Sequence, residues 1–124
     1  MAFPRVADLE TGEWQEHTRF PGIYMQGLLT TSDNPFANVN AVRVPSGGTI
    51  GRHRHVRQVE TVWVIRGAAI LTLEQTEVSL RDGQIIAIPI GLEHALRNEG
   101  PALVELLTFF TPPLTISKSG THQC

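Results

Sequence analysis

Short apolar segments, each bounded by turn residues, recur along this chain of 124 residues. Valine, isoleucine and leucine alternate imperfectly with polar residues inside these segments, which favours strands over helices. Eleven glycines and eight prolines are scattered between them. This regular spacing predicts an all-β protein, an antiparallel jelly-roll barrel of two sheets with little helix. The expected strands lie within residues 22–30, 38–45, 60–67, 68–75, 76–80, 84–89, 93–98 and 102–110.

Two glycine turns are expected to close hairpins. Gly67 lies between two of the strand-like segments, and Gly83 ends the turn "RDG" between two others. Glycine adopts positive φ without steric penalty, and tight hairpin turns require that conformation. We therefore expect positive φ at both glycines and a hairpin around each.

Composition and charge restrict the class of protein. A hydrophobic content of 41% with 18% charged residues is typical of a globular chain. The formal net charge is −2 and no run of basic residues occurs, so nucleic-acid binding is not expected. No apolar stretch is long enough to span a membrane, and no signal-peptide pattern opens the chain. Because Cys124 is the only cysteine, no intrachain disulfide forms, and we expect a cytoplasmic protein.

The length predicts one domain over residues 1–124, with residues 112–124 as a loose tail or a segment that packs on a neighbouring subunit. The segments 63–73 and 102–110 are rich in valine, isoleucine and leucine, and the second is apolar on both faces. A strand that is apolar on both faces needs cover on both. The sequence therefore predicts a homodimer.

Candidate chemistry gathers in the segment "GRHRHVRQVETVWVIRG", residues 51–67. His53 and His55 are two residues apart, so a strand would point both to one face. Glu60 follows after a stretch long enough for a tight turn that brings the next strand alongside. A third histidine, His94, follows a Pro89–Gly91 turn that redirects the chain. Imidazole and carboxylate together are typical ligands of transition metals.

These residues carry a resemblance to a known family. The chain contains Gly47-x5-His53-x-His55-x4-Glu60-x6-Gly67 and Gly83-x5-Pro89-x-Gly91-x2-His94-x3-Asn98. The two patterns, at residues 47–67 and 83–98, resemble the first and second motifs of the cupin family at every fixed position. The fifteen residues between them are similar to the short spacing of small single-domain cupins.

The resemblance implies a double-stranded β-helix, the cupin form of the jelly roll. It implies that His53, His55, Glu60 and His94 bind one divalent transition metal, and that Asn98 has a structural role. Iron, manganese, nickel, cobalt, copper and zinc all accept this donor set, so the ligands do not identify the ion.

Other polar residues are expected to play lesser parts. His17 and His122 lack any partner pattern and are expected at the surface. Arg52 and Arg54 alternate with the histidines and should face away from the ion. Arg57 and Gln58, in the turn before Glu60, are candidates for contact with a substrate at the barrel mouth. 

Two open positions on a six-coordinate ion would allow several functions. The leading hypothesis is a small-molecule enzyme of dioxygenase type that acts on an oxygen-rich chelating substrate. A metal-dependent Lewis-acid isomerase or lyase for a sugar or sugar acid is the first alternative. A non-enzymatic protein that binds a small molecule is the second, because no obvious acid–base residue accompanies the four ligands.

Overall fold

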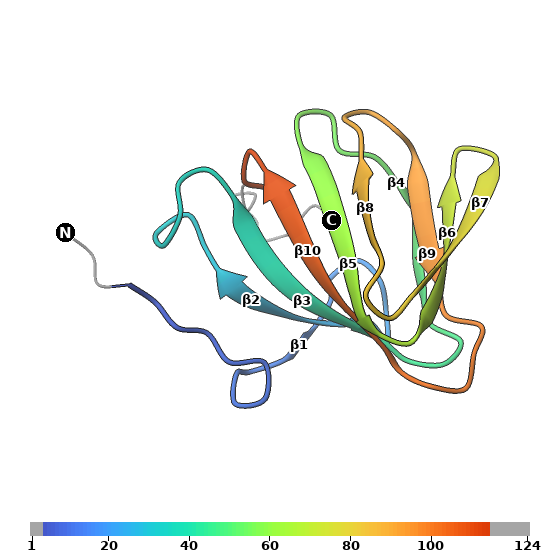
Figure 1. Ribbon diagram of the computed structural model, residues 1–124, viewed down its shortest axis with the longest axis horizontal. Coiled ribbons are helices and arrows are strands. Elements are labelled where there is room, and N and C mark those ends of the chain that lie inside the picture. Colours follow the sequence, from blue (N-terminus) through green and yellow to red (C-terminus); the bar gives the residue numbers. More distant parts are fainter. Residues whose placement is uncertain (1–3, 115–124) are drawn as a thin grey trace.

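The computed structural model describes residues 4–114, which form ten strands and no helix (Figure 1). The all-β prediction is therefore confirmed. The strands are β1 (Gln15–Glu16), β2 (Tyr24–Leu29), β3 (Asn38–Val44), β4 (Thr49–His53), β5 (Val59–Arg66), β6 (Ala68–Leu73), β7 (Thr76–Arg81), β8 (Ile85–Ile88), β9 (His94–Arg97) and β10 (Val104–Thr111).

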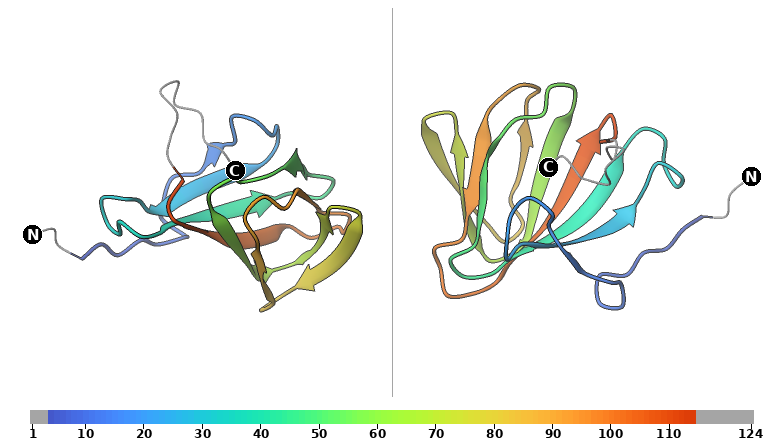
Figure 2. Two further views of the ribbon diagram at one scale, coloured as in Figure 1. Left: turned by 90° about the horizontal axis from the view of Figure 1, so that it is seen from above. Right: turned by 180° about the vertical axis from the view of Figure 1, so that it is seen from behind.

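The strands make two antiparallel sheets that face each other as a jelly roll (Figure 2). Six strands join in the order β1-β2-β3-β10-β5-β8, and four join in the order β4-β9-β6-β7. Across the part of the chain that the structure describes, no helix is long and apolar enough to cross a membrane.

The core lies between the two sheets. Alternate residues of the central strands point inward, among them Val62 and Val64 of β5 and Leu106 of β10, all at most 3% exposed. Leu71 of β6 and Leu96 of β9 meet them from the four-stranded sheet. Several of these core residues also border the polar side chains described below.

The hairpin expected around Gly67 is wrong, although its φ of 99° is positive as predicted. β5 pairs with β10 and β8, whereas β6 pairs with β7 and β9, so the chain crosses from one sheet to the other at this glycine. A Cβ at Gly67 would lie 2.8 Å from the carbonyl oxygen of Leu103 and 2.9 Å from Val104. Glycine is thus required by both the backbone conformation and the close approach of β10.

The hairpin expected around Gly83 is also wrong, because β7 belongs to the four-stranded sheet and β8 to the six-stranded sheet. The φ of Gly83 is positive, at 81°. The hairpin that does form joins β6 to β7 through Glu74 and Gln75, with Glu74 at a φ of 55°. Its two central residues lack the Asn-Gly or Asp-Gly signal of such turns, so the sequence did not reveal it.

The outer face of the six-stranded sheet has an apolar side and a side that the N-terminal segment crosses. On the six-stranded sheet, Trp63 is 41% exposed and Ile85 is 61% exposed. Across the β2–β3 side of this sheet runs the N-terminal segment, where Trp14 stacks 3.9 Å from the Arg43 guanidinium. The apolar β5–β8 side is the surface through which we still predict a homodimer. Of the predicted tail, residues 115–124 lie outside the described residues.

Candidate metal centre

The four predicted ligands come from strand ends at one end of the barrel. His53 is the last residue of β4, His94 is the first residue of β9, and Glu60 is the second residue of β5. His55 lies in the loop that follows β4. Because β4 and β5 belong to different sheets, the expected return of β5 alongside β4 is wrong. Glu60 instead approaches the histidines from the opposite sheet.

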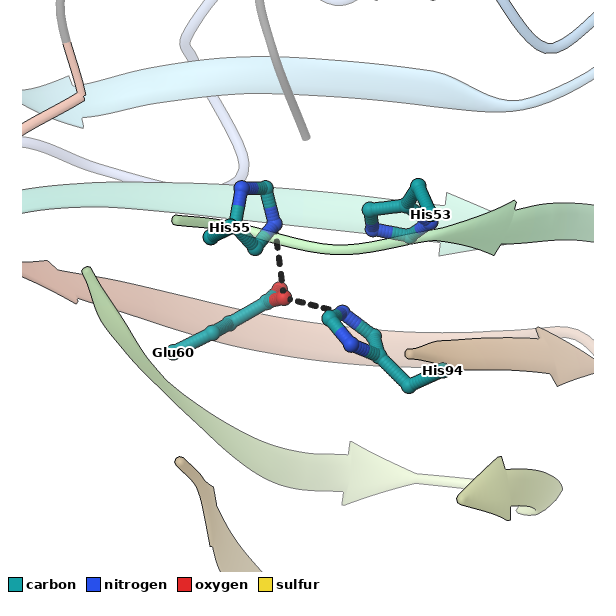
Figure 3. Close-up of side chains that lie close together, drawn as sticks. All are labelled: His53, His55, Glu60 and His94. Atoms are coloured by element: carbon teal, nitrogen blue, oxygen red, sulfur yellow. Dashed lines mark hydrogen bonds and ion pairs between the residues drawn. The ribbon is translucent and has the colours of Figure 1, made fainter. Parts of the chain in front are cut away.

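The four side chains converge inside the barrel (Figure 3). Each offers one ligand atom, and these atoms all lie within 4.8 Å of one another. His53 and His94 are register partners on neighbouring strands, with ring centroids 4.3 Å apart. Each of the four residues is at most 8% exposed, so water screens them little.

Backbone carbonyls orient two of the imidazoles. Nδ1 of His53 lies 2.7 Å from the carbonyl oxygen of Gly51, and Nδ1 of His94 lies 2.9 Å from that of Leu92. A carbonyl only accepts hydrogen bonds, so each Nδ1 carries the proton. Whenever such a ring is neutral, its Nε2 lone pair is directed into the cluster, in the tautomer that metal-ligating histidines use.

His55 supplies the clearest sign of a missing positive partner. Its Nε2 is buried and forms no hydrogen bond with residues 4–114, although it lies 3.3 Å from Oε1 of Glu60. Its ring packs edge-on against Phe110, with centroids 5.0 Å apart. Burying a nitrogen without a partner costs the free energy of its hydration. A bound ion at its lone pair would compensate for that cost.

The same Glu60 oxygen is 2.9 Å from Nε2 of His94. Burial alone would raise the pKa of Glu60, but the close contacts with the imidazoles of His55 and His94 outweigh it and lower the pKa to about 2. Burial lowers the pKa of His94, but the contacts with Glu60 and the Leu92 carbonyl reverse this, and the net pKa is raised. A carboxylate that stays ionised inside the barrel thus draws positive charge toward itself.

His53 behaves differently. Burial lowers its pKa to about 4, and the nearby His94 adds to this effect. The ring is therefore neutral at physiological pH and ready to coordinate. Three imidazole nitrogens and one carboxylate oxygen form a buried cluster that is consistent with a site for a divalent transition metal.

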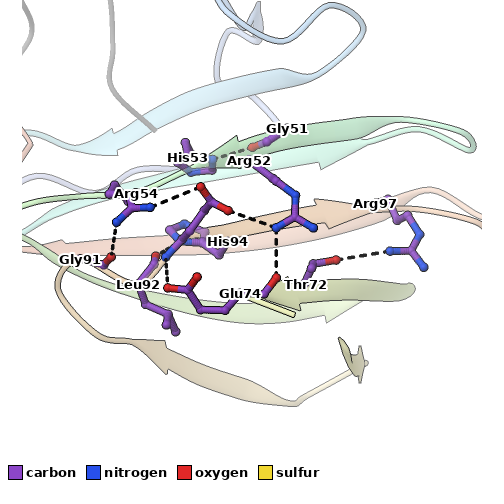
Figure 4. Close-up of polar contacts among 11 residues, drawn as sticks. Gly51, Arg52, His53, Arg54, Thr72, Glu74, Gly91, Leu92, His94 and Arg97 are labelled. Atoms are coloured by element: carbon purple, nitrogen blue, oxygen red, sulfur yellow. Dashed lines mark hydrogen bonds and ion pairs between the residues drawn. The ribbon is translucent and has the colours of Figure 1, made fainter. Parts of the chain in front are cut away.

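Surface ion pairs brace the cluster from behind (Figure 4). The side chains of Arg52 and Arg54 face outward as expected, and contact the two carboxylate oxygens of Glu93 at 3.1 and 3.4 Å. Glu93 immediately precedes His94, so these contacts join the two ligand-bearing segments. The amide of Gly91 also donates to the carbonyl of His55 at 2.8 Å.

Arg57 and Gln58 lie in the loop between His55 and Glu60. Arg57 is exposed and makes no ion pair with any residue of the described range 4–114. Gln58 is half-buried, with its amide 3.4 Å from the carbonyl oxygen of Pro113. Contact between these side chains and a substrate stays a prediction.

The surface placement of His17 is wrong, because the residue is only 5% exposed. Its Nδ1 accepts hydrogen bonds from the amides of Arg19 and Phe20, at 3.0 and 3.2 Å. The imidazole therefore caps a tight turn just before Pro21 and Gly22, and that turn signal was the available clue. His122 lies outside the described residues.

The structural role expected of Asn98 is confirmed. Its amide donates to the carbonyls of Val44 and Ala102, at 2.9 and 2.8 Å, and its Oδ1 accepts from the amide of Gly100 at 3.0 Å. Asn98 thus ties the loop after β9 to the end of β3 at the closed end of the barrel.

A small internal cavity of about 30 Å³ borders the cluster. Three of the four candidate ligands line it, but His55 does not. The remaining lining residues are Val42, Ile50, Val62, Leu71, Ile88, Leu96, Leu106 and Thr108.

Comparison with known families agrees with the motifs and the fold. The cupin domain family matches residues 40–110, which contain all four candidate ligands. The chain belongs to the cupin family. This places the His₃Glu cluster inside a fold that hosts many chemistries, so the family alone does not specify the reaction.

Solved structures include other small cupins. A predicted oxalate decarboxylase from Thermotoga maritima superposes with a TM-score of 0.77 over 87% of this chain and 99% of that chain, at 19% identity. A cupin-superfamily sugar phosphate isomerase from Silicibacter pomeroyi superposes with a TM-score of 0.76 over 87% of this cupin and 75% of the other, at 28% identity. 

Among curated proteins, mannose-1-phosphate guanylyltransferase from Klebsiella pneumoniae is 33% identical over 73 residues. The match covers 59% of this cupin but only 16% of that longer protein. The likeness therefore concerns only a segment of that protein.

Proposed function

We propose that this cupin is a metal-dependent enzyme of dioxygenase type that acts on a small, oxygen-rich, chelating substrate. The observation that carries the proposal is the buried His55 Nε2, which has no hydrogen-bond partner and faces Glu60. His53, His55, Glu60 and His94 would hold one divalent ion. Such an ion would supply Lewis acidity and, if redox-active, electron exchange with dioxygen.

The protein's own groups prepare this site. The carbonyls of Gly51 and Leu92 hold two rings in the coordinating tautomer, so little reorganisation accompanies metal binding. Apolar residues around the cluster exclude water and strengthen its electrostatics. At the mouth, Arg57 would contact an anionic group of the substrate and Gln58 a neutral polar group.

A Lewis-acid isomerase or lyase for a sugar or sugar acid is the second candidate. It is favoured by the names of two relatives, a sugar phosphate isomerase and a mannose-1-phosphate guanylyltransferase. The guanidinium of Arg57, which has no ion-pair partner among residues 4–114, would suit a phosphate or carboxylate on such a substrate.

The test begins with elemental analysis of protein purified without chelators or an affinity tag. The protein is then stripped and reloaded with iron, manganese or zinc. Oxygen uptake by the iron form, in the presence of hydroxycarbonyl or catechol compounds, is the expected result. Anaerobic conversion of aldose or ketose phosphates by the manganese or zinc form would favour the second candidate.

A matched control is the His55→Ala variant carried through the same stripping and reloading. It should retain neither the metal nor the activity. Metal binding without turnover of any of these compounds would contradict both enzyme candidates and leave the non-enzymatic binding role.

A further inference from the structure

A polar hollow lies between the N-terminal segment and strands β2 and β3, on the side of the six-stranded sheet that lies away from the four-stranded sheet (Figure 1). Its volume is about 480 Å³. It shares no lining residue with the cavity at the metal centre. The polar hollow is therefore a separate feature of the molecule, and its volume falls within the roughly 300–1,000 Å³ of sites for small molecules.

A buried amide without a hydrogen-bond partner lines this hollow. Asn40 of β3 is only 6% exposed, and its side-chain amide forms no hydrogen bond within residues 4–114. Burying an amide without a partner costs free energy. A ligand that hydrogen-bonds to Asn40 would recover that cost.

Gly27 of β2 leaves this amide uncovered. Gly27 is the register partner of Asn40 on the neighbouring strand. A Cβ at position 27 would lie 3.7 Å from Oδ1 of Asn40, which is an ordinary contact distance. Gly27 is not among the glycines with positive φ, so the backbone does not require glycine here. The missing side chain instead leaves Oδ1 of Asn40 facing the polar hollow.

The charges around the polar hollow disfavour an anionic ligand. Among the described residues its one cationic side chain is Arg5, which already contacts Asp33 at 3.7 Å and the carbonyl oxygen of Leu28 at 3.2 Å. Two carboxylates, those of Glu13 and Glu16, line the same space. A ligand that donates hydrogen bonds therefore fits better than one that carries negative charge.

The remaining polar groups of the lining are neutral. Gln15 and Gln26 carry amides, and Thr18 and Thr30 carry hydroxyls. Amides and hydroxyls both donate and accept hydrogen bonds, as the adjacent hydroxyls of a polyol do. This lining matches a ligand that presents several hydroxyls at once.

From these observations we infer that the polar hollow is a second binding site, for a neutral polyhydroxylated molecule of about monosaccharide size. One hydroxyl of this ligand donates to Oδ1 of Asn40, above the gap that Gly27 leaves. The inference goes beyond the proposed function and does not rest on it, because no candidate metal ligand lines this site.

Methyl α-glucoside is the probe, because it carries several hydroxyls but no carbonyl or carboxylate group that would chelate the metal centre. The full chain, with and without bound zinc, would be titrated while the NMR signals of the Asn40 side-chain amide and the Gly27 backbone amide are followed. Saturable shifts with the same affinity in both samples are expected. Shifts that stay linear with concentration, or saturation that requires zinc, would overturn the inference.

Two ions test the class of ligand. Methylammonium and inorganic phosphate should cause no saturable shift at the Asn40 amide. Tighter binding of methylammonium than of the glucoside would overturn the choice of a neutral ligand in favour of a cation held by Glu13 and Glu16. Tighter binding of phosphate would overturn it in favour of an anion held by Arg5.

Two variants and a control sharpen the test. Gly27→Val covers the amide from an exposed strand position, and Asn40→Leu replaces the amide with an apolar group of similar volume. Each should weaken glucoside binding at least tenfold while circular dichroism and metal content stay those of the wild type. Ser79→Val changes an exposed strand position of the other sheet and should leave binding unchanged. Wild-type affinity in Gly27→Val would contradict the site, even if Asn40→Leu failed to fold.

Discussion

Two glutamates are buried in neighbouring strands of the same sheet, and their surroundings are opposite. Glu105 of β10 is 1% exposed on the outer face, where Arg43 and Arg66 each donate to it at 2.7 Å. Glu60 of β5 is 7% exposed on the inner face, where its polar side-chain contacts among residues 4–114 are with imidazoles. Glu105 therefore has permanent positive charge beside it, whereas the charge beside Glu60 has to come from a proton or a metal ion.

The difference separates a carboxylate that the protein neutralises with its own arginines from one that is a candidate metal ligand. Burial raises the pKa of Glu105, but its two arginines overcome this and the pKa is lowered. A register shift between Glu105 and Leu106 turns Arg66 to the outer face, so the pairing is built into the sheet. At Glu60 the sheet supplies no cation, and a raised pKa at His94 marks where the charge is needed.

The largest effect is expected from a substitution in the inner cluster, the three histidines around Glu60. His55→Ala removes the imidazole whose Nε2 would ligate the metal. We expect metal affinity to fall at least 100-fold while the barrel stays folded. Metal content after dialysis against a mild chelator, with circular dichroism, measures both. His122→Ala is the control and should keep its metal. Full metal retention by the His55 variant would refute the four-ligand assignment.

At the outer cluster, Glu105→Gln should leave two arginines without their counter-charge. We expect the free energy of unfolding to fall by about 3 kcal/mol. This is the low end of the cost of breaking a buried ion pair, because Arg66 is partly solvated. Urea unfolding measures this change. Metal content should equal that of the wild type, and a loss of metal would show that the two clusters are not independent.

The pH dependence of the metal-free protein offers a third test. The folded-state pKa of His53 is about 4, below the ordinary histidine value of 6.5, because burial disfavours its charged form. Between these values the unfolded chain binds a proton that the folded chain does not, so stability falls as pH falls. From pH 6.5 to 5.0 we expect a loss of about 2 kcal/mol, at about 1.4 kcal/mol per pH unit.

Glu60 and His94 change the stability of the protein at pH values outside the interval in which His53 does. Glu60, with a pKa of about 2, contributes stability that is lost only below pH 4.5. His94, with a raised pKa, contributes stability that is present below 6.5 and lost as pH rises above it. Urea unfolding of stripped protein at several pH values should show a slope in wild type that is absent in His53→Gln. The same slope in both proteins would contradict the assignment to His53.

The smallest effect concerns the outer face that Glu105 shares with Trp63. We predict a homodimer of twice 13.7 kDa, and Trp63→Glu should weaken it by about tenfold in dissociation constant. Light scattering across a dilution series measures the mass. A wild-type mass near 14 kDa at micromolar concentration would refute the dimer.

Local signals in the sequence predicted most of the strands, and the resemblance to the cupin motifs predicted the four side chains that converge. Strand character and the motif spacings depend on neighbouring residues, and so do the positive φ values at Gly67 and Gly83. Strand pairing does not depend on neighbouring residues alone. The same glycine turn can close a hairpin within one sheet or carry the chain from one sheet to the other. The partner of β5 is β10, some forty residues further along the chain, and nothing near Gly67 specifies it.

His17 illustrates a second limit. A lone histidine in a polar stretch is usually exposed, but here its ring accepts two backbone amides that a tight turn would otherwise leave unpaired. The need for that cap arises from the turn geometry, which the sequence only hints at through Pro21 and Gly22.

The bracing of the ligands from the outside has a consequence for how this protein can diverge. Arg52, Arg54 and Glu93 hold the two ligand segments together on the face opposite the cluster. Positions 56–58 at the mouth make little contribution to that bracing, so they are free to vary while the ion stays in place. A library randomised at these three positions should therefore contain many members that keep the metal site, so the mouth of this barrel can change while its centre stays the same.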